Sequence, residues 1–126
     1  MNNTITFFDE DNGAVIWEIA GAVDFHFFKT VSEITHVLRQ NDNSIKQINC
    51  IKSMELLSDE ILDFIKGEYF VKAKSSGLKF FAFVVPSNEE GRLSMEIANE
   101  GASQKWDMEI KYFNSRKEAT DWLATK

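Results

Sequence analysis

The sequence predicts a single α/β domain over residues 1–126, with a mixed, mostly parallel five-stranded sheet and four helices. Apolar runs of strand length alternate with amphipathic segments of helix length, in the order β-β-α-β-α-β-α-β-α. Three of the helical segments open on a serine, the residue type that favours the position before a helix. Because helices separate successive strands, right-handed parallel crossovers should join them in sequence order. A doubly wound order with a crevice at its switch point is the alternative.

The first two strands, residues 5–8 and 14–20, should form a hairpin. The polar run between them ends in Asn12 and Gly13, a pair that favours a tight turn. So short a link makes the two strands antiparallel and places the first at an edge of the sheet. The other expected elements are a helix over 25–39 capped by Asp24, a strand over 45–51, a helix over 59–72 capped by Ser58, a strand over 78–85, a helix from Ser87 and Glu90 to about Glu100 with Gly101 as its stop, a strand over 108–113, and a last helix begun by Ser115 and Glu118.

Charge and composition exclude several classes of function. The net charge of −6 argues against a nucleic-acid partner and against an anionic membrane surface. The longest apolar run, residues 80–85, is too short for a membrane span, and the first residues lack the features of a signal peptide. Cys50 is the single cysteine, so no intrachain disulfide can form. We therefore expect a soluble, cytoplasmic protein.

No motif for catalysis or for a metal or other cofactor stands out. The two histidines, His26 and His36, lie about three turns apart on one expected helix and cannot share a metal. The acidic run at 9–11 lacks the spacing of a calcium loop, and the six glycines never cluster into a phosphate loop. Cys50, between apolar residues of a strand, is interpreted as an inert buried thiol. An enzyme whose groups converge only in space is the least favoured alternative.

Ser58 is the residue that we single out as a candidate site. It follows a strand and a short loop at the expected start of a helix, where its first role is to cap that helix. A phosphate on Ser58 would meet free backbone N–H groups, although Asp59 would oppose it by like charge. With the apolar Met54 and Leu57 nearby, this segment is the candidate phospho-acceptor and interaction surface.

Two segments carry a resemblance to a known family. The ending from Tyr112 to Leu123 resembles the F-x-[ST]-x-x-x-A-x-x-W-L pattern of bacterial SpoIIAA-like proteins. The segment 48–61 sits where anti-sigma-factor antagonists carry a strand, a loop and a phosphorylated serine; Ser58 matches that serine, and Asn49 stands where an aspartate is usual. The element order thus resembles the STAS domain over nearly the whole chain. This resemblance implies a non-catalytic module of the bacterial cytoplasm that binds another protein.

Two further hypotheses concern the phenylalanines. The resemblance extends to lipid-binding relatives of the SEC14 type, which implies a pocket for a small apolar ligand. Phe25, Phe27 and Phe28, together with Phe81 and Phe83, would line it, unless they are simply core. If the helices cover mainly one face of the sheet, Phe81, Phe83 and Val85 on the other face would need a second copy of the chain to bury them.

Overall fold

The computed structural model describes residues 3–55, 57–86 and 89–126. The elements in order are β1 (Asn3–Asp9), β2 (Ala14–Gly21), α1 (Phe25–Asp42), β3 (Lys46–Met54), α2 (Asp59–Phe64), the π-helix η1 (Ile65–Tyr69), α3 (Phe70–Ser75), β4 (Phe80–Val84), α4 (Glu89–Ala98), α5 (Ala102–Lys105), β5 (Glu109–Phe113) and α6 (Arg116–Leu123). The predicted order of strands and helices is confirmed. The short helix α5 is additional.

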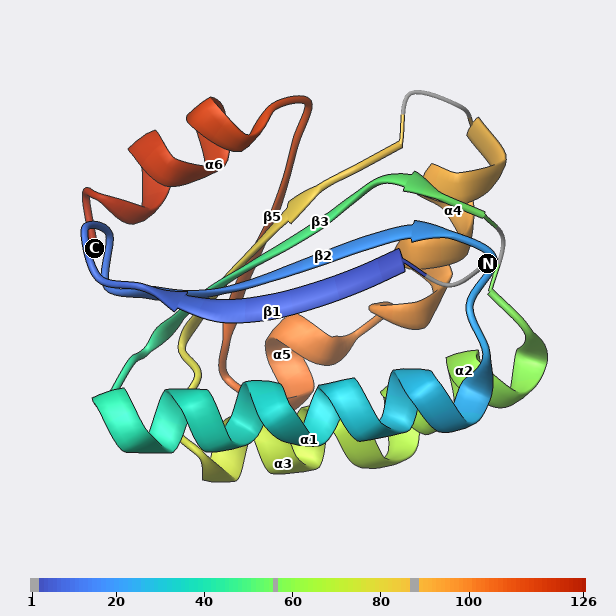
Figure 1. The fold of residues 1–126 in the computed structure, drawn as a ribbon, viewed down its shortest axis with the longest axis horizontal. Coiled ribbons are helices and arrows are strands. Elements are labelled where there is room, and N and C mark those ends of the chain that lie inside the picture. Colours follow the sequence, from blue (N-terminus) through green and yellow to red (C-terminus); the bar gives the residue numbers. More distant parts are fainter. Residues whose placement is uncertain (1–2, 56, 87–88) are drawn as a thin grey trace.

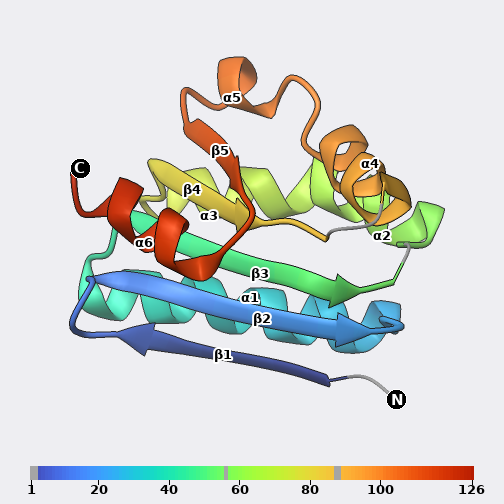
Figure 2. The ribbon, with the colours of Figure 1, turned by 90° about the horizontal axis from the view of Figure 1, so that it is seen from above.

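The five strands lie in the sheet in sequence order, β1-β2-β3-β4-β5 (Figure 2). β1 is antiparallel to β2, whereas β3, β4 and β5 each run parallel to the preceding strand. The predicted hairpin closes at Gly13, which has φ of +64° and donates its N–H to the Asp9 carbonyl at 2.8 Å. The mixed five-stranded sheet is thus confirmed, and the doubly wound order is wrong.

Helices cover the two faces of the sheet unequally (Figure 1). α1, the α2–η1–α3 segment, α4 and α5 supply side chains to a large core on one face, and α6 packs alone on the other. Phe81, Phe83 and Val85 belong to the large core under the helices. The expectation that they lie on the uncovered face is therefore wrong, and they supply no surface for a dimer.

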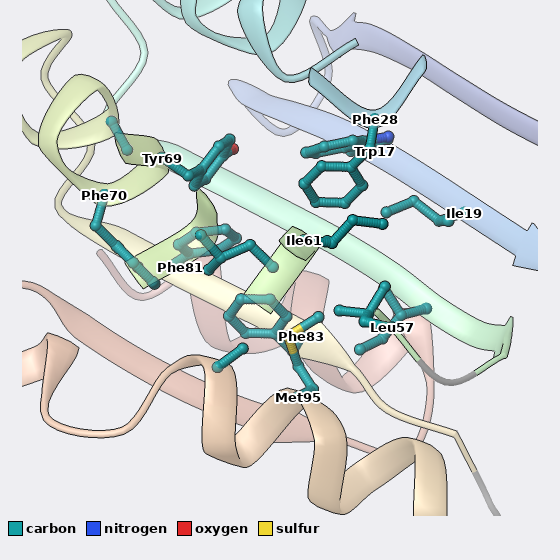
Figure 3. Packing of buried hydrophobic residues seen from close by; sticks show 14 of the residues in the cluster. Trp17, Ile19, Phe28, Leu57, Ile61, Tyr69, Phe70, Phe81, Phe83 and Met95 are labelled. Atoms are coloured by element: carbon teal, nitrogen blue, oxygen red, sulfur yellow. The ribbon is translucent and has the colours of Figure 1, made fainter. Parts of the chain in front are cut away.

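The large core is mainly aromatic at its centre (Figure 3). The ring of Trp17 lies 5.0 Å from that of Phe28, and Phe81 stacks on Phe83 at 4.4 Å between centroids. The indole N–H of Trp17 donates to the Thr4 hydroxyl at 2.6 Å, so the one polar atom of that ring is satisfied. Burial of these rings, together with the aliphatic side chains around them, stabilises the fold.

The helix expected over 59–72 is interrupted by the π-helix η1. Its core-facing residues Ile61, Ile65, Tyr69 and Ala73 recur every four positions. In an α-helix of 3.6 residues per turn, such a stripe rotates by about 40° with each turn. The wider turn of a π-helix offsets part of this rotation and keeps the stripe on the sheet. The expectation of one regular α-helix is therefore wrong at its centre.

Three helices have the N-terminal capping residues that the sequence predicts. Asp24, Ser58 and Ser115 each accept a hydrogen bond from a backbone N–H in the first turn of the helix that follows. Gly101 has φ of +74°, a left-handed conformation that ends one helical stretch before α5 begins. The cap expected at Ser87 lies outside the described residues.

Candidate functional site

Several helices begin at one edge of the sheet, where the parallel strands β2, β3 and β4 end. α1, α2 and α4 all start there (Figure 1). The loop after β3 is tied to the end of β2 by a hydrogen bond of 3.0 Å from the Glu55 N–H to the Gly21 carbonyl. Loops and helix N-termini thus converge on this carboxyl edge, which is the candidate recognition surface.

Ser58 lies on this edge with its side chain exposed. Its backbone is extended, with φ of −70° and ψ of 159°, and its hydroxyl oxygen accepts a hydrogen bond from the Ile61 N–H at 3.2 Å. The Ser58 carbonyl accepts the first helical hydrogen bond, from the Leu62 N–H at 3.0 Å. Ser58 therefore caps α2 and also presents its hydroxyl to the outside.

Met54 and Leu57 do not lie on the surface beside Ser58. Their exposed fractions are 3% and 7%, and both pack into the large core. Both side chains anchor the loop between β3 and α2 to the core. β3 continues to Met54 and directs that side chain under the helices. Of the four residues proposed for an interaction surface, only Ser58 and Asp59 are exposed.

The exposed charge on this edge is mainly negative. Six exposed acidic residues lie at or next to the starts of α1, α2 and α4: Asp24, Glu55, Asp59, Glu60, Glu89 and Glu90. Acids in the first turn of a helix interact favourably with its dipole, so they stabilise α2 and α4. They also give the edge a potential that attracts a basic surface and repels an acidic one.

The phenylalanines proposed for an apolar pocket lie in packed core. Phe28, Phe81 and Phe83 line a cavity of about 10 Å³, which is space for about one water molecule. Phe25 lies outside that lining and packs edge-on against Phe64, at 5.8 Å between centroids. Phe27 is 40% exposed on α1. The described core around these rings has no room for a lipid chain, and the hypothesis of an apolar-ligand pocket lined by these phenylalanines is not favoured.

A buried polar network, which was not predicted from the sequence, lies between α1, β3 and η1. Arg39 is fully buried and donates to the Gln47 side chain. Gln47 donates in turn to the Tyr69 hydroxyl and to the Asn49 side chain, both at 2.7 Å. Among the described residues no carboxylate forms an ion pair with Arg39. Within that part of the chain, the acceptors that contact this buried cation are neutral. Polar residues at alternate positions of an otherwise apolar strand, Gln47 and Asn49, were the one available signal.

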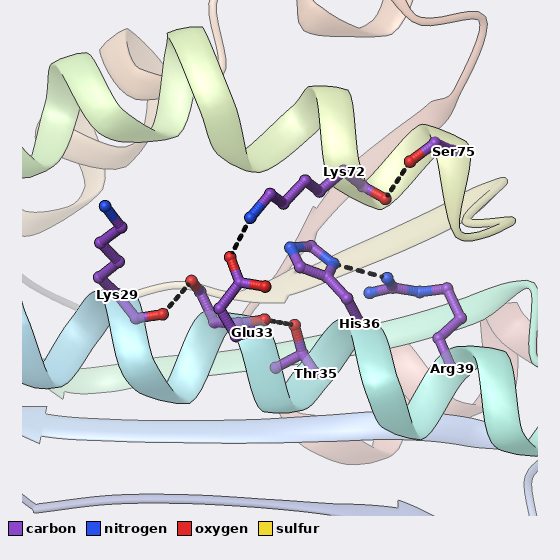
Figure 4. Close-up of polar contacts among 8 residues, drawn as sticks. Lys29, Glu33, Thr35, His36, Arg39, Lys72 and Ser75 are labelled. Atoms are coloured by element: carbon purple, nitrogen blue, oxygen red, sulfur yellow. Dashed lines mark hydrogen bonds and ion pairs between the residues drawn. The ribbon is translucent and has the colours of Figure 1, made fainter.

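His36 completes the network on α1 (Figure 4). One Arg39 guanidinium nitrogen lies 3.0 Å from its Nδ1, and Arg39 also donates to the Ser76 hydroxyl at 2.7 Å. Because arginine can only donate, Nδ1 must be the acceptor, so Nε2 carries the proton of a neutral ring. Burial, and then the positive charge of Arg39, lower the pKa of His36 to about 4. Glu33, which bonds Lys72, opposes this shift.

The free energy of unfolding should therefore decrease as the pH is lowered, in a window set by the pKa of His36. Because its pKa is lower in the folded chain than its ordinary value of 6.5, the unfolded chain binds more protons between pH 6.5 and pH 4. Acidification across that window should lower the free energy of unfolding by about 3 kcal/mol through His36 alone. Urea unfolding at several pH values, compared with His36→Gln, measures this contribution as the difference between the two slopes.

The matched control is His26→Gln, because His26 is an exposed histidine of the same helix. It should keep the pH dependence of the wild type, whereas His36→Gln should flatten it. Equal slopes for the wild type and His36→Gln would contradict this role of the buried ring.

The remaining chemical features of the described residues are few. Cys50 is a free, partly buried thiol on the α6 side of the sheet, less buried than expected. Across residues 3–55, 57–86 and 89–126, no three histidine, cysteine or acidic side chains gather as ligands for one metal ion. Over the same ranges, none of the helices has the length and apolarity that crossing a bilayer would require.

The fold of this chain resembles that of two proteins of known structure, although the sequence itself has no match. No family model matches the sequence, and no curated protein matches it. An uncharacterised protein of the DUF3478 family with a SpoIIAA-like fold, from Shewanella loihica PV-4, superposes with a TM-score of 0.59 at 18% identity, over 97% of this chain and 93% of its own. A protein proposed to be an anti-sigma factor antagonist, from Thermotoga maritima, superposes with a TM-score of 0.64 at 18% identity, over 95% and 93%. The chain thus has a SpoIIAA-like fold.

Proposed function

We propose that this chain is a non-catalytic regulatory module of the bacterial cytoplasm that acts by binding another protein. The observation that carries the proposal is the carboxyl edge of the sheet, where exposed Ser58 and Asp59 stand among further acidic residues. The proposed activity of the structural neighbour from Thermotoga maritima supports the same class of function. A surface of this charge would favour a partner that presents basic residues.

The partner should meet the start of α2. A photoreactive residue in place of the exposed Asp59 should give a covalent adduct with a single protein in bacterial lysate, and excess wild-type chain should compete it away. The same photoreactive residue in place of Lys117, an exposed position on α6, should give no such adduct. Equal labelling from both positions, or labelling that the wild-type chain does not reduce, would count against the proposal.

Charge reversal should then weaken the isolated complex. Asp59→Lys with Glu60→Lys should raise its dissociation constant by about tenfold at low salt, mainly through slower association. The control is Glu10→Lys with Asp11→Lys, which changes the net charge by the same amount. These two residues lie in the β1–β2 hairpin turn, at the opposite end of β2 from the start of α2. That control should bind like the wild type, and surface plasmon resonance can measure both rates. If the two double variants lose affinity equally, net charge and not this edge determines binding.

A further inference from the structure

β1 has one hydrogen-bonded neighbour, β2, and its other side is an edge of the sheet in the part of the chain that the structure describes. The Asp9 carbonyl accepts from Gly13 and so faces β2. Backbone groups alternate in direction along an antiparallel strand. Those of Thr4, Thr6 and Phe8 therefore point away from β2, where they are free to pair with another strand.

The two edges of the sheet differ in how they are protected. β5, at the far edge, carries the exposed charged residues Glu109 and Lys111, and charges of this kind hinder edge-to-edge pairing. β1 has no charged residue from position 4 to position 8 and consists there of threonine, isoleucine and phenylalanine. These residue types favour strands. β1 therefore lacks the charged residues that protect the β5 edge.

Apolar side chains border this edge on both faces of the sheet. Ile5 and Phe7 are 56% and 37% exposed, and Phe7 pairs with Ile16 of the α6-side core, so both lie on that face. On the opposite face, Phe27 and Ile34 of α1 are 40% and 44% exposed, and Phe27 and Thr4 line the same small cavity of about 10 Å³. Ile34 lies seven residues after Phe27, so both occupy the same side of the helix. Exposed apolar side chains thus flank the β1 edge on both faces of the sheet.

We propose that two copies of this chain pair their β1 strands antiparallel and join the two sheets into one. The register that pairs all seven residues of β1 places Thr6 opposite Thr6 and Ile5 opposite Phe7. It also places Asp9 opposite position 3, a neutral asparagine in the sequence, so that like charges do not meet. A second copy is the occupant that this argument supports, because the strand is complementary to itself in that register.

The dimer should be reversible and weak. Seven residues at about 3.3 Å each give a seam of about 23 Å, which is short for a specific interface. The net charge of −6 on each copy opposes association, so added salt should strengthen the dimer. Sedimentation of the wild-type chain up to millimolar concentration should show a monomer–dimer equilibrium. This inference does not depend on the binding of the partner proposed above.

Two variants at Thr6 test the edge itself. Thr6→Val and Thr6→Pro both remove the hydroxyl that donates to the Ile16 carbonyl at 2.8 Å. Only proline also removes the outward N–H, and it leaves the ladder to β2 intact because that N–H does not point toward β2. Thr6→Val should dimerise like the wild type. Thr6→Pro should raise the dissociation constant by more than about tenfold, with an unchanged circular dichroism spectrum.

A second pair of variants tests the apolar border. Ile5→Lys should also weaken the dimer more than about tenfold, whereas Leu93→Lys, at a 57% exposed site on α4, should not. In the wild type, the amides of Thr4, Thr6 and Phe8 should exchange more slowly as concentration rises. A wild-type chain that stays monomeric overturns the proposal, even if the edge takes up a strand of another protein. A dimer that survives both Thr6→Pro and Ile5→Lys overturns it as well.

Discussion

Arg39→Ala should lower the free energy of unfolding by about 4 kcal/mol. The fully buried guanidinium is the donor to the Gln47 side chain, to the Ser76 hydroxyl and to the ring of His36. Alanine would leave these acceptors without their donor and would open a cavity between α1 and β3. Each buried acceptor left unpaired costs about 1–3 kcal/mol. Urea unfolding at pH 7 measures the change.

Arg116→Ala is the control for the loss of an arginine. Arg116 forms an ion pair with Glu18 at 2.5 Å, and both side chains are about two-fifths exposed. Its removal should cost less than about 1 kcal/mol. Arg39→Met should recover only part of the stability lost in Arg39→Ala, because methionine fills the cavity but leaves the Gln47, Ser76 and His36 acceptors without their donor. An Arg39→Ala variant within 1 kcal/mol of the wild type would mean that water or a rearranged side chain satisfies the network.

The sequence predicted the fold well where local signals agree. Asn12 and Gly13 marked the hairpin, and helical segments between strands implied the parallel order that the sheet adopts. The π-helix η1 was not predicted because its cause is tertiary. The wider turn keeps the stripe from Ile61 to Ala73 against the sheet by offsetting the rotation that builds up over several turns, and a window of residues read as an ideal helix carries no sign of that change.

The face on which a strand residue lies was harder to predict than the strand itself. The alternation of Phe81 and Phe83 fixes that they share a face, but not which helices cover that face. The same difficulty affects Met54, since β3 extends three residues beyond the expected end at Ile51 and a register shift lies in its pairing with β2. Met54 was therefore placed on the surface, although it packs inside.

The candidate site was predicted in part. Ser58 was found because a serine before an acidic first turn is a local signal, and the structure confirms that it caps α2. Arg39 was not found, because arginine is almost never fully buried and its position at the expected end of a helix looked exposed. α1 continues to Asp42, so Arg39 lies within the last turn and on the buried side of the helix.

Phe81→Ala should also lower the free energy of unfolding strongly, by about 3–5 kcal/mol. Phe81 is 1% exposed, stacks on Phe83 at 4.4 Å between centroids, and lies 6.1 Å from Phe70. The loss has two parts, the transfer of the removed ring atoms and the cavity that the neighbours fail to fill. Phe27→Ala removes the same atoms from a 40% exposed position on α1 and should cost less than about 1 kcal/mol.

The Phe81→Ala variant also tests whether this core can hold an apolar ligand. Removing the ring should enlarge the cavity of about 10 Å³ that Phe81 lines, and an enlarged apolar cavity takes up small molecules such as benzene. Saturating benzene should therefore raise the unfolding temperature of Phe81→Ala and leave that of the wild type unchanged. Equal stabilisation of both proteins would show that the native core opens to apolar ligands, and would restore the hypothesis of an apolar-ligand pocket. No stabilisation of either, together with a loss below 1 kcal/mol, would mean that the helices collapse onto the sheet when the ring is removed.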